Sequence, residues 1–450
     1  MIVSKFGGTS VGSAKNMKKV AKIITSNDVP KIIVLSAMSG TTNTLVMIND
    51  LYQKGNLVEA RLEIKSLYMK YQNEIQDLFD KEAYIDKAEV FLGYIFHKLI
   101  SLLEEQDIVN TKKVILAQGE LLSTHIFQLY LEHENIQSTM ISALSFMKID
   151  VMREPDKAFI TNKLQNILSK NKGNDIFITQ GFICKNTLGD IDNLERGGSD
   201  YTASLIGAAV DASKIEIYTD IDGMHNNDPR YVDQTFSIDE ISFDEAAELA
   251  YFGAKILHPQ SLLPAKENNI PVLVKNTFYP QEAGTLICNN PKSDYHIRAI
   301  AAKDNITAIK IKSYRMLLAY GFLKKIFEIF DSNKTSIDMI TTSEVAVSLT
   351  IDNTKNIDII NNELSSFGSV EIDSDLSIIC IAGDIAQNKK GITAEIFNSL
   401  KEIPIRMISY GGSNYNLSFL VKTDKKIEVL NLLNNGLFEE LLKTKDKALA

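Results

Sequence analysis

The sequence has 450 residues, a length that predicts two or three domains. Hydrophobic residues make up 45% and charged residues 23%, as in soluble globular proteins, and no apolar run is long enough to cross a bilayer. The formal net charge of −9 argues against a general nucleic-acid-binding protein.

The cysteines and the N-terminus predict the cellular compartment. Cys184, Cys288 and Cys380 are odd in number and far apart, so they indicate neither a disulfide framework nor a zinc site. The N-terminus enters an apolar run directly and has no signal-peptide pattern. We therefore expect a cytoplasmic protein with no membrane and no nucleic-acid partner.

The first strand and turn predict a phosphate-binding site. An apolar run at residues 2–4 predicts a strand, and a helix is expected over 14–26. Between them, Gly7 and Gly8 allow a sharp turn and close approach to a ligand, while Thr9 and Ser10 can cap the helix. Backbone N–H groups at such a helix start attract anions, and Lys5 adds a positive charge. Because the stretch is neither a Walker nor a Rossmann motif, an ordinary tight turn remains the alternative.

Strands and helices alternate through the first two thirds of the chain. Repeated units of this kind predict an α/β domain with a mostly parallel sheet and helices on both faces. Ligands bind beyond the carboxyl ends of such strands. Polar residues at or just after predicted strand ends are Lys5, Ser36, Glu120, Arg196 and Asp220, which predicts one shared site. After the first, strands are expected over 32–35, 114–117, 175–180, 215–218 and 272–274, and helices over 57–106, 201–210 and 243–252.

The last third contains an internal repeat with an offset of about 70 residues. Leu323, Ile326, Phe327 and Phe330 form a helical stripe that predicts core packing. Each copy predicts a small α+β module, and two such modules in tandem favour sensing or pairing over a second catalytic centre. The corresponding stretches are 321–322 with 391–392, 337–340 with 405–408, and 347–349 with 417–419.

Taken in order, these motifs resemble the aspartate kinases of the amino-acid kinase superfamily, and the repeat resembles their paired ACT domains. The resemblance covers nearly the whole chain and implies a catalytic domain over 1–295 and a regulatory region over 296–450. One ACT module of this family is typically inserted within the other, which implies modules at about 305–384 and at 296–304 plus 385–450. The matching segments are 5–11, 118–120, 196–202, 219–220, 228–230 and 252–259.

The resemblance implies transfer of the ATP γ-phosphoryl group to the β-carboxylate of L-aspartate, the first step toward lysine, threonine and methionine. It implies Mg²⁺ held by the ATP phosphates, with no protein side chain as a direct ligand. The aspartate side chain has a pKa of ~3.9 and is already ionised at pH 7. Positioning and charge neutralisation are therefore expected to carry the catalysis.

Residue roles are implied by position within the matching motifs. The expected catalytic residues are Lys5 and Lys255, as cations over the phosphates, and Asp200, which orients Lys5. The planar fork of Arg196 can hold a carboxylate of the substrate, and Glu120 suits its ammonium group. The other substrate-side residues are Thr42, Gly197, Gly198 and Ser199. The ATP-side residues are Lys5, Gly7, Gly8, Ser36, Thr219, Asp220, Arg230 and Lys255. Contacts to adenine stay open, because His225 lies in a loop where related enzymes often carry a tyrosine.

The first module implies an amino-acid effector site, and its sequence resembles the lysine-sensitive members. Asp338 can pair with the ammonium of L-lysine, the turn at Gly321 can offer backbone groups to its carboxylate, and Glu344 is a second partner for an ammonium. Ala319 stands where those members carry a serine. The expected effector residues are Met316, Ala319, Gly321, Phe322, Leu323, Ser336, Asp338, Thr342, Ser343 and Glu344. The resemblance also implies a homodimer or higher oligomer formed through the ACT domains.

Two other functions compete with this prediction. One is a different amino-acid kinase, acting on acetylglutamate or glutamate; the Phe-Gly-Ala-Lys segment at 252–255 and the ACT-like pair favour aspartate. The other is an inactive amino-acid sensor that keeps the fold. Retention of Lys5, Glu120, Arg196, Asp200 and Lys255 argues against the sensor.

Overall fold

A computed structural model describes residues 1–104, 108–195, 197–252, 257–292, 296–313, 320–385 and 390–449. The chain forms two compact units. The first contains Met1–Met224, Asp239–Phe243 and Leu257–Pro291, and the second contains His225–Ile238, Asp244–Ile256 and Lys292–Ala450. The boundary expected at residue 296 stays a prediction, and the second unit also takes in the two upstream stretches.

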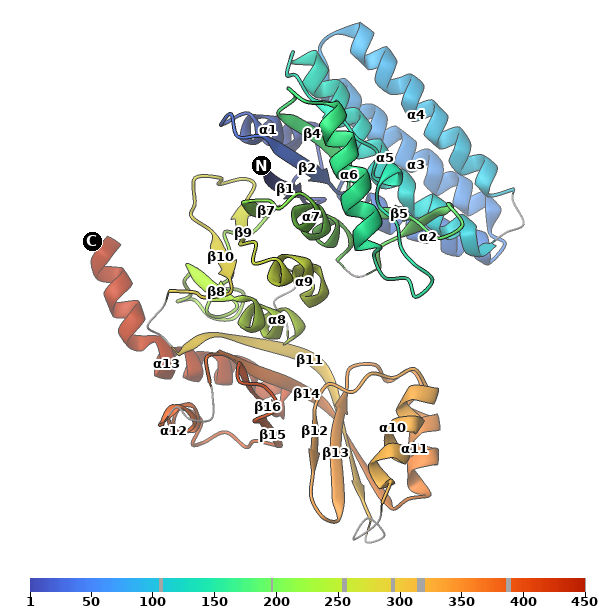
Figure 1. Cartoon of the computed structure of the whole chain (residues 1–450). Helices are drawn as coiled ribbons and strands as arrows, with labels where there is room; N and C mark the ends of the chain where they lie inside the picture. The colour runs from blue at the N-terminus through green and yellow to red at the C-terminus, as the bar shows by residue number, and fades with distance from the viewer. Residues whose placement is uncertain are drawn as a thin grey trace. The chain divides into compact units, whose positions relative to one another are not determined.

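The first unit is built on an 8-stranded sheet with the order β3-β4-β2-β1-β7-β9-β10-β8 (Figure 1). Every neighbouring pair is parallel except β9 with β10. The strands are β1 Ile2–Phe6, β2 Lys31–Leu35, β3 Thr139–Met140, β4 Ile176–Gln180, β7 Lys214–Thr219, β8 Glu240–Ser242, β9 Val272–Asn276 and β10 Thr285–Cys288. A separate hairpin pairs β5 Ile183–Lys185 with β6 Ile191–Asn193. Strands β1 and β2 are buried along their whole length, as expected for central parallel strands.

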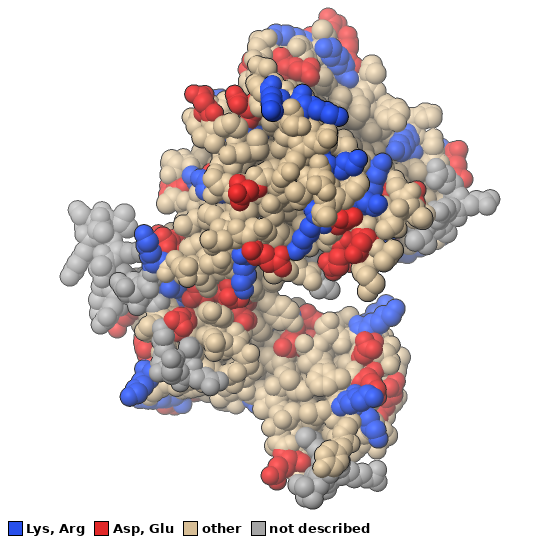
Figure 2. Space-filling view, in the orientation of Figure 1, with Lys and Arg blue, Asp and Glu red and all other residues tan. Residues whose placement is uncertain are grey.

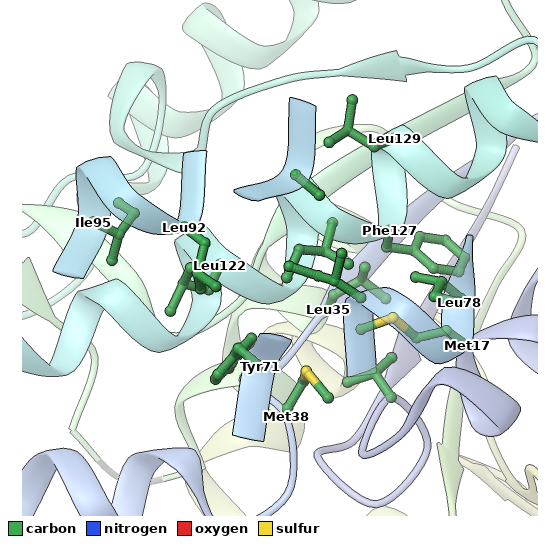
Figure 3. Packing of buried hydrophobic residues seen from close by; sticks show 14 of the residues in the cluster. Met17, Leu35, Met38, Tyr71, Leu78, Leu92, Ile95, Leu122, Phe127 and Leu129 are labelled. Carbon is green, nitrogen blue, oxygen red and sulfur yellow. The ribbon is translucent and has the colours of Figure 1, made fainter. Parts of the chain in front are cut away.

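Helices cover both faces of this sheet, as predicted. Side chains alternate along β1, so Phe6 packs into the core with α1, α3, α4 and α5, whereas Lys5 points to α7 on the other face. Figure 3 shows part of that core, to which Leu35, Tyr71, Leu92 and Phe127 contribute side chains. The helices are α1 Ala14–Ile24, α2 Thr41–Gln53, α3 Leu57–Leu78, α4 Glu82–Leu102, α5 Ile108–His133, α6 Lys157–Lys170, α7 Gly198–Ala209, α8 Phe243–Phe252 and α9 Pro259–Glu267.

The strand predicted over 114–117 is wrong, because these residues lie inside α5. A short apolar run fits a buried strand and a buried helix equally well, and length decides between them. Here the helix continues for 26 residues. Its buried positions Ile115, Leu122, Ile126 and Leu129 recur at helical spacing. Glu120 therefore reaches the site from the middle of a helix and not from a strand end.

The cap predicted for the first helix is also wrong. The N-cap of α1 is Ser13, whose Oγ accepts a hydrogen bond from Asn16 N at 3.3 Å. Ser10 instead shares a hydrogen bond of 2.6 Å with the hydroxyl of Thr277, which follows β9. The turn after β1 is thus fastened to a strand that is remote in sequence.

The second unit contains a 6-stranded sheet with the order β12-β13-β11-β14-β16-β15. Its neighbouring strands are all antiparallel. The strands are β11 Ile297–Lys312, β12 Ile340–Thr342, β13 Ala346–Ile351, β14 Ser369–Gly383, β15 Met407–Tyr410 and β16 Asn416–Lys422. The helices are α10 Phe322–Ser332, α11 Ile357–Ser365, α12 Ile392–Asn398 and α13 Lys426–Leu449. In Figure 1, α10 and α11 lie beside the end of the sheet that carries β12 and β13.

The repeat is a structural one. Gly321 and Gly391 both have positive φ, +79° and +92°, and each caps the helix of its copy. The hairpin of β12 and β13 corresponds to that of β15 and β16. The long strands β11 and β14 pass through both copies, and β14 changes partner from β11 alone to β11 with β16 between Asp373 and Leu376. The module boundary predicted at 384 falls at the end of β14 and stays a prediction.

The face of the molecule drawn in Figure 2 carries charges of both signs. Figure 2 shows Lys and Arg side chains interspersed with Asp and Glu over the face that it presents. Among the described residues, the helices include none that combines the length and the apolar character needed to span a membrane.

Candidate active site and effector site

A buried ion pair lies near the carboxyl end of β1. Lys5 Nζ is 2.7 Å from Oδ1 of Asp200, and the two side chains are only 11% and 15% exposed. Asp200 lies in the first turn of α7, which starts after Gly197 at φ +65°. This pairing holds the Lys5 ammonium at the edge of the sheet, as an orienting role for Asp200 requires. The role itself stays a prediction.

The glycine turn after β1 packs closely against the loop after β2. A Cβ on Gly8 would lie 3.0 Å from the carbonyl oxygen of Ala37, so a side chain there would displace that loop. Gly7 N–H donates to the carbonyl of Tyr218 at 3.1 Å and is not available to a phosphate in this structure. Ser36 N–H likewise donates to the carbonyl of Phe6 at 3.2 Å. Of the predicted donors, Gly7 thus uses its backbone N–H to join the turn to β7, and Ser36 uses its N–H to join the loop after β2 to the end of β1.

Glu120 brings an unpaired carboxylate oxygen to the same loops. Glu120 as a whole is 3% exposed, and the Ala37 N–H donates a hydrogen bond to its Oε1 at 3.2 Å. Within the described part of the chain, the buried Oε2 has no hydrogen-bond partner. Burial raises the pKa of Glu120 to about 8. A buried polar atom without a partner in a native site points to a missing ligand, and an ammonium group would satisfy it.

Gly119 explains how a mid-helix glutamate reaches the site. A Cβ on Gly119 would lie 2.8 Å from the Cβ of Ala37, so the glycine lets α5 approach the loop after β2. One turn later, Ser123 Oγ donates to the carbonyl of Ser36 at 2.7 Å. The Gln-Gly-Glu motif therefore marks a close helix–loop contact rather than a turn.

The loop after β4 packs closely against the start of α7, and the sequence analysis assigned this loop no role. A Cβ on Gly181 would lie 2.5 Å from the hydroxyl of Ser199, and a Cβ on Gly198 would lie 2.4 Å from the Phe182 ring. Phe182 N–H donates to the Thr202 hydroxyl at 3.0 Å. The glycine directly after a predicted strand was the available signal. Thr42, the remaining substrate-side residue, is half-buried in α2.

The nucleotide-side residues divide between the two units. Thr219 ends β7, and its hydroxyl donates to Oδ1 of the exposed Asp220 at 3.1 Å. Arg230 belongs to the second unit, where its side chain is 74% exposed and lies 2.6 Å from Oδ2 of Asp228. Burial tends to raise the pKa of Asp228, but the hydrogen bonds from Arg230 outweigh it and hold this pKa below its usual value.

Several predicted residues lie outside the described residues: Arg196, Lys255, Met316 and Ala319. Among the described residues, no group of three or more His, Cys, Asp or Glu side chains is arranged to hold a metal ion.

Asp338, the residue expected to bind an effector ammonium, already has partners in the chain. Its side chain is 1% exposed, and its Oδ1 lies 2.8 Å from Lys303 Nζ and 2.8 Å from the Tyr251 hydroxyl. Lys303 also lies 2.9 Å from Oδ2 of Asp352. Burial tends to lower the pKa of Lys303, but both carboxylates outweigh it and raise this pKa.

The other expected effector residues differ in accessibility. Phe322 packs into the core under α10, so only its backbone is available to a ligand. The remaining described residues, Leu323, Ser336, Thr342, Ser343 and Glu344, are exposed. Gly321 has the positive φ that its turn requires.

A mostly parallel sheet with a buried lysine, glycine loops and an unpaired carboxylate near its edge fits a phosphate-handling enzyme of the amino-acid kinase type. Residues 1–276 match the amino acid kinase family, and residues 379–437 match an ACT domain. The chain is 35% identical over 461 residues to lysine-sensitive aspartokinase 3 of Escherichia coli, covering 98% of this chain and 99% of that protein. It therefore belongs to the amino acid kinase family, among the aspartokinases.

Solved structures give the same result. The E. coli aspartokinase III complex with aspartate and ADP, described as the R-state, matches with a TM-score of 0.84 at 34% identity, covering 97% of this chain and 100% of that one. The complex of that enzyme with lysine and aspartate, the T-state, has a TM-score of 0.81 at 35% identity, covering 97% and 99%. The predicted fold and family are confirmed.

Proposed function

We propose that this chain transfers the γ-phosphoryl group of ATP to the β-carboxylate of L-aspartate, giving 4-phospho-L-aspartate and ADP. The observation that carries the proposal is the unpaired, buried Oε2 of Glu120, on the side of α5 that packs against the loop after β2, next to the turn that follows Lys5 and its partner Asp200. The loop around Ala37 contacts both Glu120 and the glycine turn that directly follows Lys5. The Glu120 carboxylate can bind the ammonium group of an amino acid, and the Lys5 ammonium can bind the phosphoryl group. A kinase that acts on an amino acid needs both.

This phosphoryl transfer requires the protein to position the substrates and neutralise their charges, and it requires no general base. The substrate carboxylate is ionised at pH 7, so no base has to remove a proton. Lys5, held by Asp200, neutralises charge between the carboxylate and the phosphoryl group, and Lys255 supplies a second cation. Arg196 grips a substrate carboxylate with its planar fork. Mg²⁺ would be held by the ATP phosphates, with Asp220 aiding its placement, and would supply positive charge that neutralises the phosphate oxygens.

A coupled assay of ADP release tests the proposal. ADP release that depends on L-aspartate, with product trapped as the hydroxamate, is the expected result. The same assay with acetylglutamate and with glutamate addresses the other amino-acid kinases. ADP release with acetylglutamate or glutamate, and not with aspartate, would identify that compound as the substrate. No ADP release with any of the three would indicate an inactive sensor.

Aspartate binding is expected to release a proton at pH 7. The raised pKa of about 8 keeps Glu120 mostly protonated in the free enzyme. The ammonium group of the substrate favours the ionised form, so binding lowers that pKa and expels the proton. The release fades as the pH rises through 8, because the carboxyl group is then ionised beforehand. Calorimetry at pH 7.0 and 8.5, in buffers of different ionisation enthalpy, measures it; equal release at both values would contradict the assignment.

We further propose that L-lysine is the feedback inhibitor and binds at the first ACT module with Asp338 as its ammonium partner, in a homodimer or higher oligomer. The sequence of this module and the unpaired Oδ2 of Asp338 support the proposal. A ligand inhibits only if it binds the two states of the enzyme unequally.

Titration of the kinase with lysine, threonine and methionine, each separately, tests the effector. We expect inhibition by lysine, relieved in Asp338→Ala with activity in the absence of lysine largely retained. Inhibition by threonine and not by lysine would overturn the assignment. Light scattering with and without lysine reports the oligomeric state.

A further inference from the structure

The carboxylate of Asp338 joins parts of the second unit that are distant in sequence. Asp338 precedes β12, Lys303 lies on β11, and Tyr251 lies on α8. The Tyr251 hydroxyl and Lys303 Nζ both bind Oδ1 at 2.8 Å, and Lys303 Nζ lies 4.8 Å from the centre of the Tyr251 ring. This cluster of Asp338, Lys303 and Tyr251 therefore attaches α8 to the 6-stranded sheet of the second unit.

The cluster has capacity for one more cation. Asp338 and Asp352 share the single ammonium of Lys303, which leaves one negative charge in the group. The Oδ2 of Asp338 is buried and has no hydrogen-bond partner in the described part of the chain. Leaving a buried charged oxygen unpaired is costly, so a ligand ammonium would be bound strongly there.

Helix α8 is attached to the sheet at further points. Glu245 Oε1 lies 3.3 Å from Nε of Arg298 on β11, with both side chains buried, and Glu248 accepts a hydrogen bond from Asn416 on β16. Figure 1 shows α8 lying along β11. The chain enters this helix from residues 239–243 of the first unit and returns to that unit at 257. Lys255 follows Tyr251 by four positions in the sequence.

We propose that Tyr251 belongs to the effector site and transmits its occupancy to the kinase unit. An effector ammonium at the unpaired Oδ2 draws negative charge away from Oδ1 and weakens the hydrogen bond that the Tyr251 hydroxyl donates there, so binding of the effector loosens the attachment of α8. Because residues 239–243, which lead into this helix, and residues from 257 onward belong to the first unit, a shift of α8 is passed along the chain to the kinase unit. The proposal rests on the proposed function and adds the residue through which the regulatory site acts.

Linkage makes the proposal measurable on the full-length protein. The dissociation constant of L-lysine is determined by calorimetry with and without saturating L-aspartate, ADP and Mg²⁺. The ratio of the two constants measures the coupling between the sites, typically about 5- to 150-fold. In Tyr251→Phe, which removes only the hydroxyl, we expect lysine still to bind and this ratio to fall toward 1.

The controls separate coupling from folding and from binding. Tyr279→Phe changes a tyrosine that is 59% exposed, and it should keep the wild-type ratio. Asp338→Asn should lose lysine binding itself. Thermal unfolding of each variant establishes that it is folded.

Each outcome decides the proposal. A wild-type ratio in folded Tyr251→Phe, or a wild-type protein that binds no lysine, would overturn the role of Tyr251. A wild-type protein without aspartate-dependent ADP release would instead refute the proposed function, which the kinase assay measures separately.

Discussion

Lys5→Ala is expected to lower kcat by about 10²–10³-fold, which corresponds to ~2.7–4 kcal/mol for one preorganised charge-stabilising group. In the proposed mechanism, the Lys5 ammonium, which lies 2.7 Å from Asp200, stabilises charge that develops during phosphoryl transfer. The stability of the protein should change less than its activity, because Asp200 keeps some access to water at 15% exposure. Steady-state kinetics together with thermal unfolding measure both effects.

Lys31→Met provides a matched control for Lys5. Lys31 is also a buried lysine on a central strand, but its Nζ donates to the carbonyls of Ile24 and Asn27 at 2.7 and 2.9 Å. Burial lowers the pKa of this lysine. Its loss should reduce the melting temperature and leave kcat nearly unchanged. A folded Lys5→Ala enzyme with near-normal kcat would remove Lys5 from the proposed chemistry.

Glu120→Gln is expected to raise the KM for aspartate by at least about 30-fold, because truncating one partner of a buried charge pair costs ~2–5 kcal/mol. Gln keeps the acceptor for Ala37 N–H and the shape of the side chain, so the loss reports the charge. The KM for ATP should change little. Kinetics with each substrate varied in turn measure the difference, and an unchanged aspartate KM would place the ammonium elsewhere.

Glu120→Gln should also raise the free energy of unfolding of the protein. Glu120 has a pKa of about 8 in the folded chain and about 4.3 when unfolded. Ionisation therefore favours the unfolded state between these values, and the free energy of unfolding falls as the pH rises through this window. At pH 7 we expect Glu120→Gln to gain up to about 3 kcal/mol. This gain should shrink toward pH 4.5, which denaturant unfolding at several pH values measures.

Glu216→Gln is the matched control for Glu120. Glu216 is another buried carboxylate, but Ser4 Oγ at 3.1 Å and Lys214 Nζ at 2.8 Å already satisfy it. Removing its charge should destabilise the fold and leave the aspartate KM unchanged. Stabilisation by Glu216→Gln, or destabilisation by Glu120→Gln, would contradict the difference in pairing on which both expectations depend.

The sequence by itself determined the elements whose signal is local. Strands β1, β2, β4, β7 and β9 are short apolar runs bounded by turn residues, and their burial follows from composition. The repeated glycines at 321 and 391 predicted matching helix starts, since both turns need positive φ. The motifs predicted the family because, taken in order, they contain the residue types that bind phosphate and the amino-acid substrate.

Only the tertiary structure decided which polar groups are paired. The 114–117 run is helical because α5 packs against the core between Ile115 and Leu131, and that helix carries Glu120 to the loop after β2. Lys5 and Lys31 look alike in sequence, yet one meets a carboxylate and the other meets backbone carbonyls. Asp338 finds Lys303 and Tyr251, which are 35 and 87 residues away. Pairing depends on distances of a few ångströms between chain segments that the fold brings together, and local residue patterns contain no information about those distances.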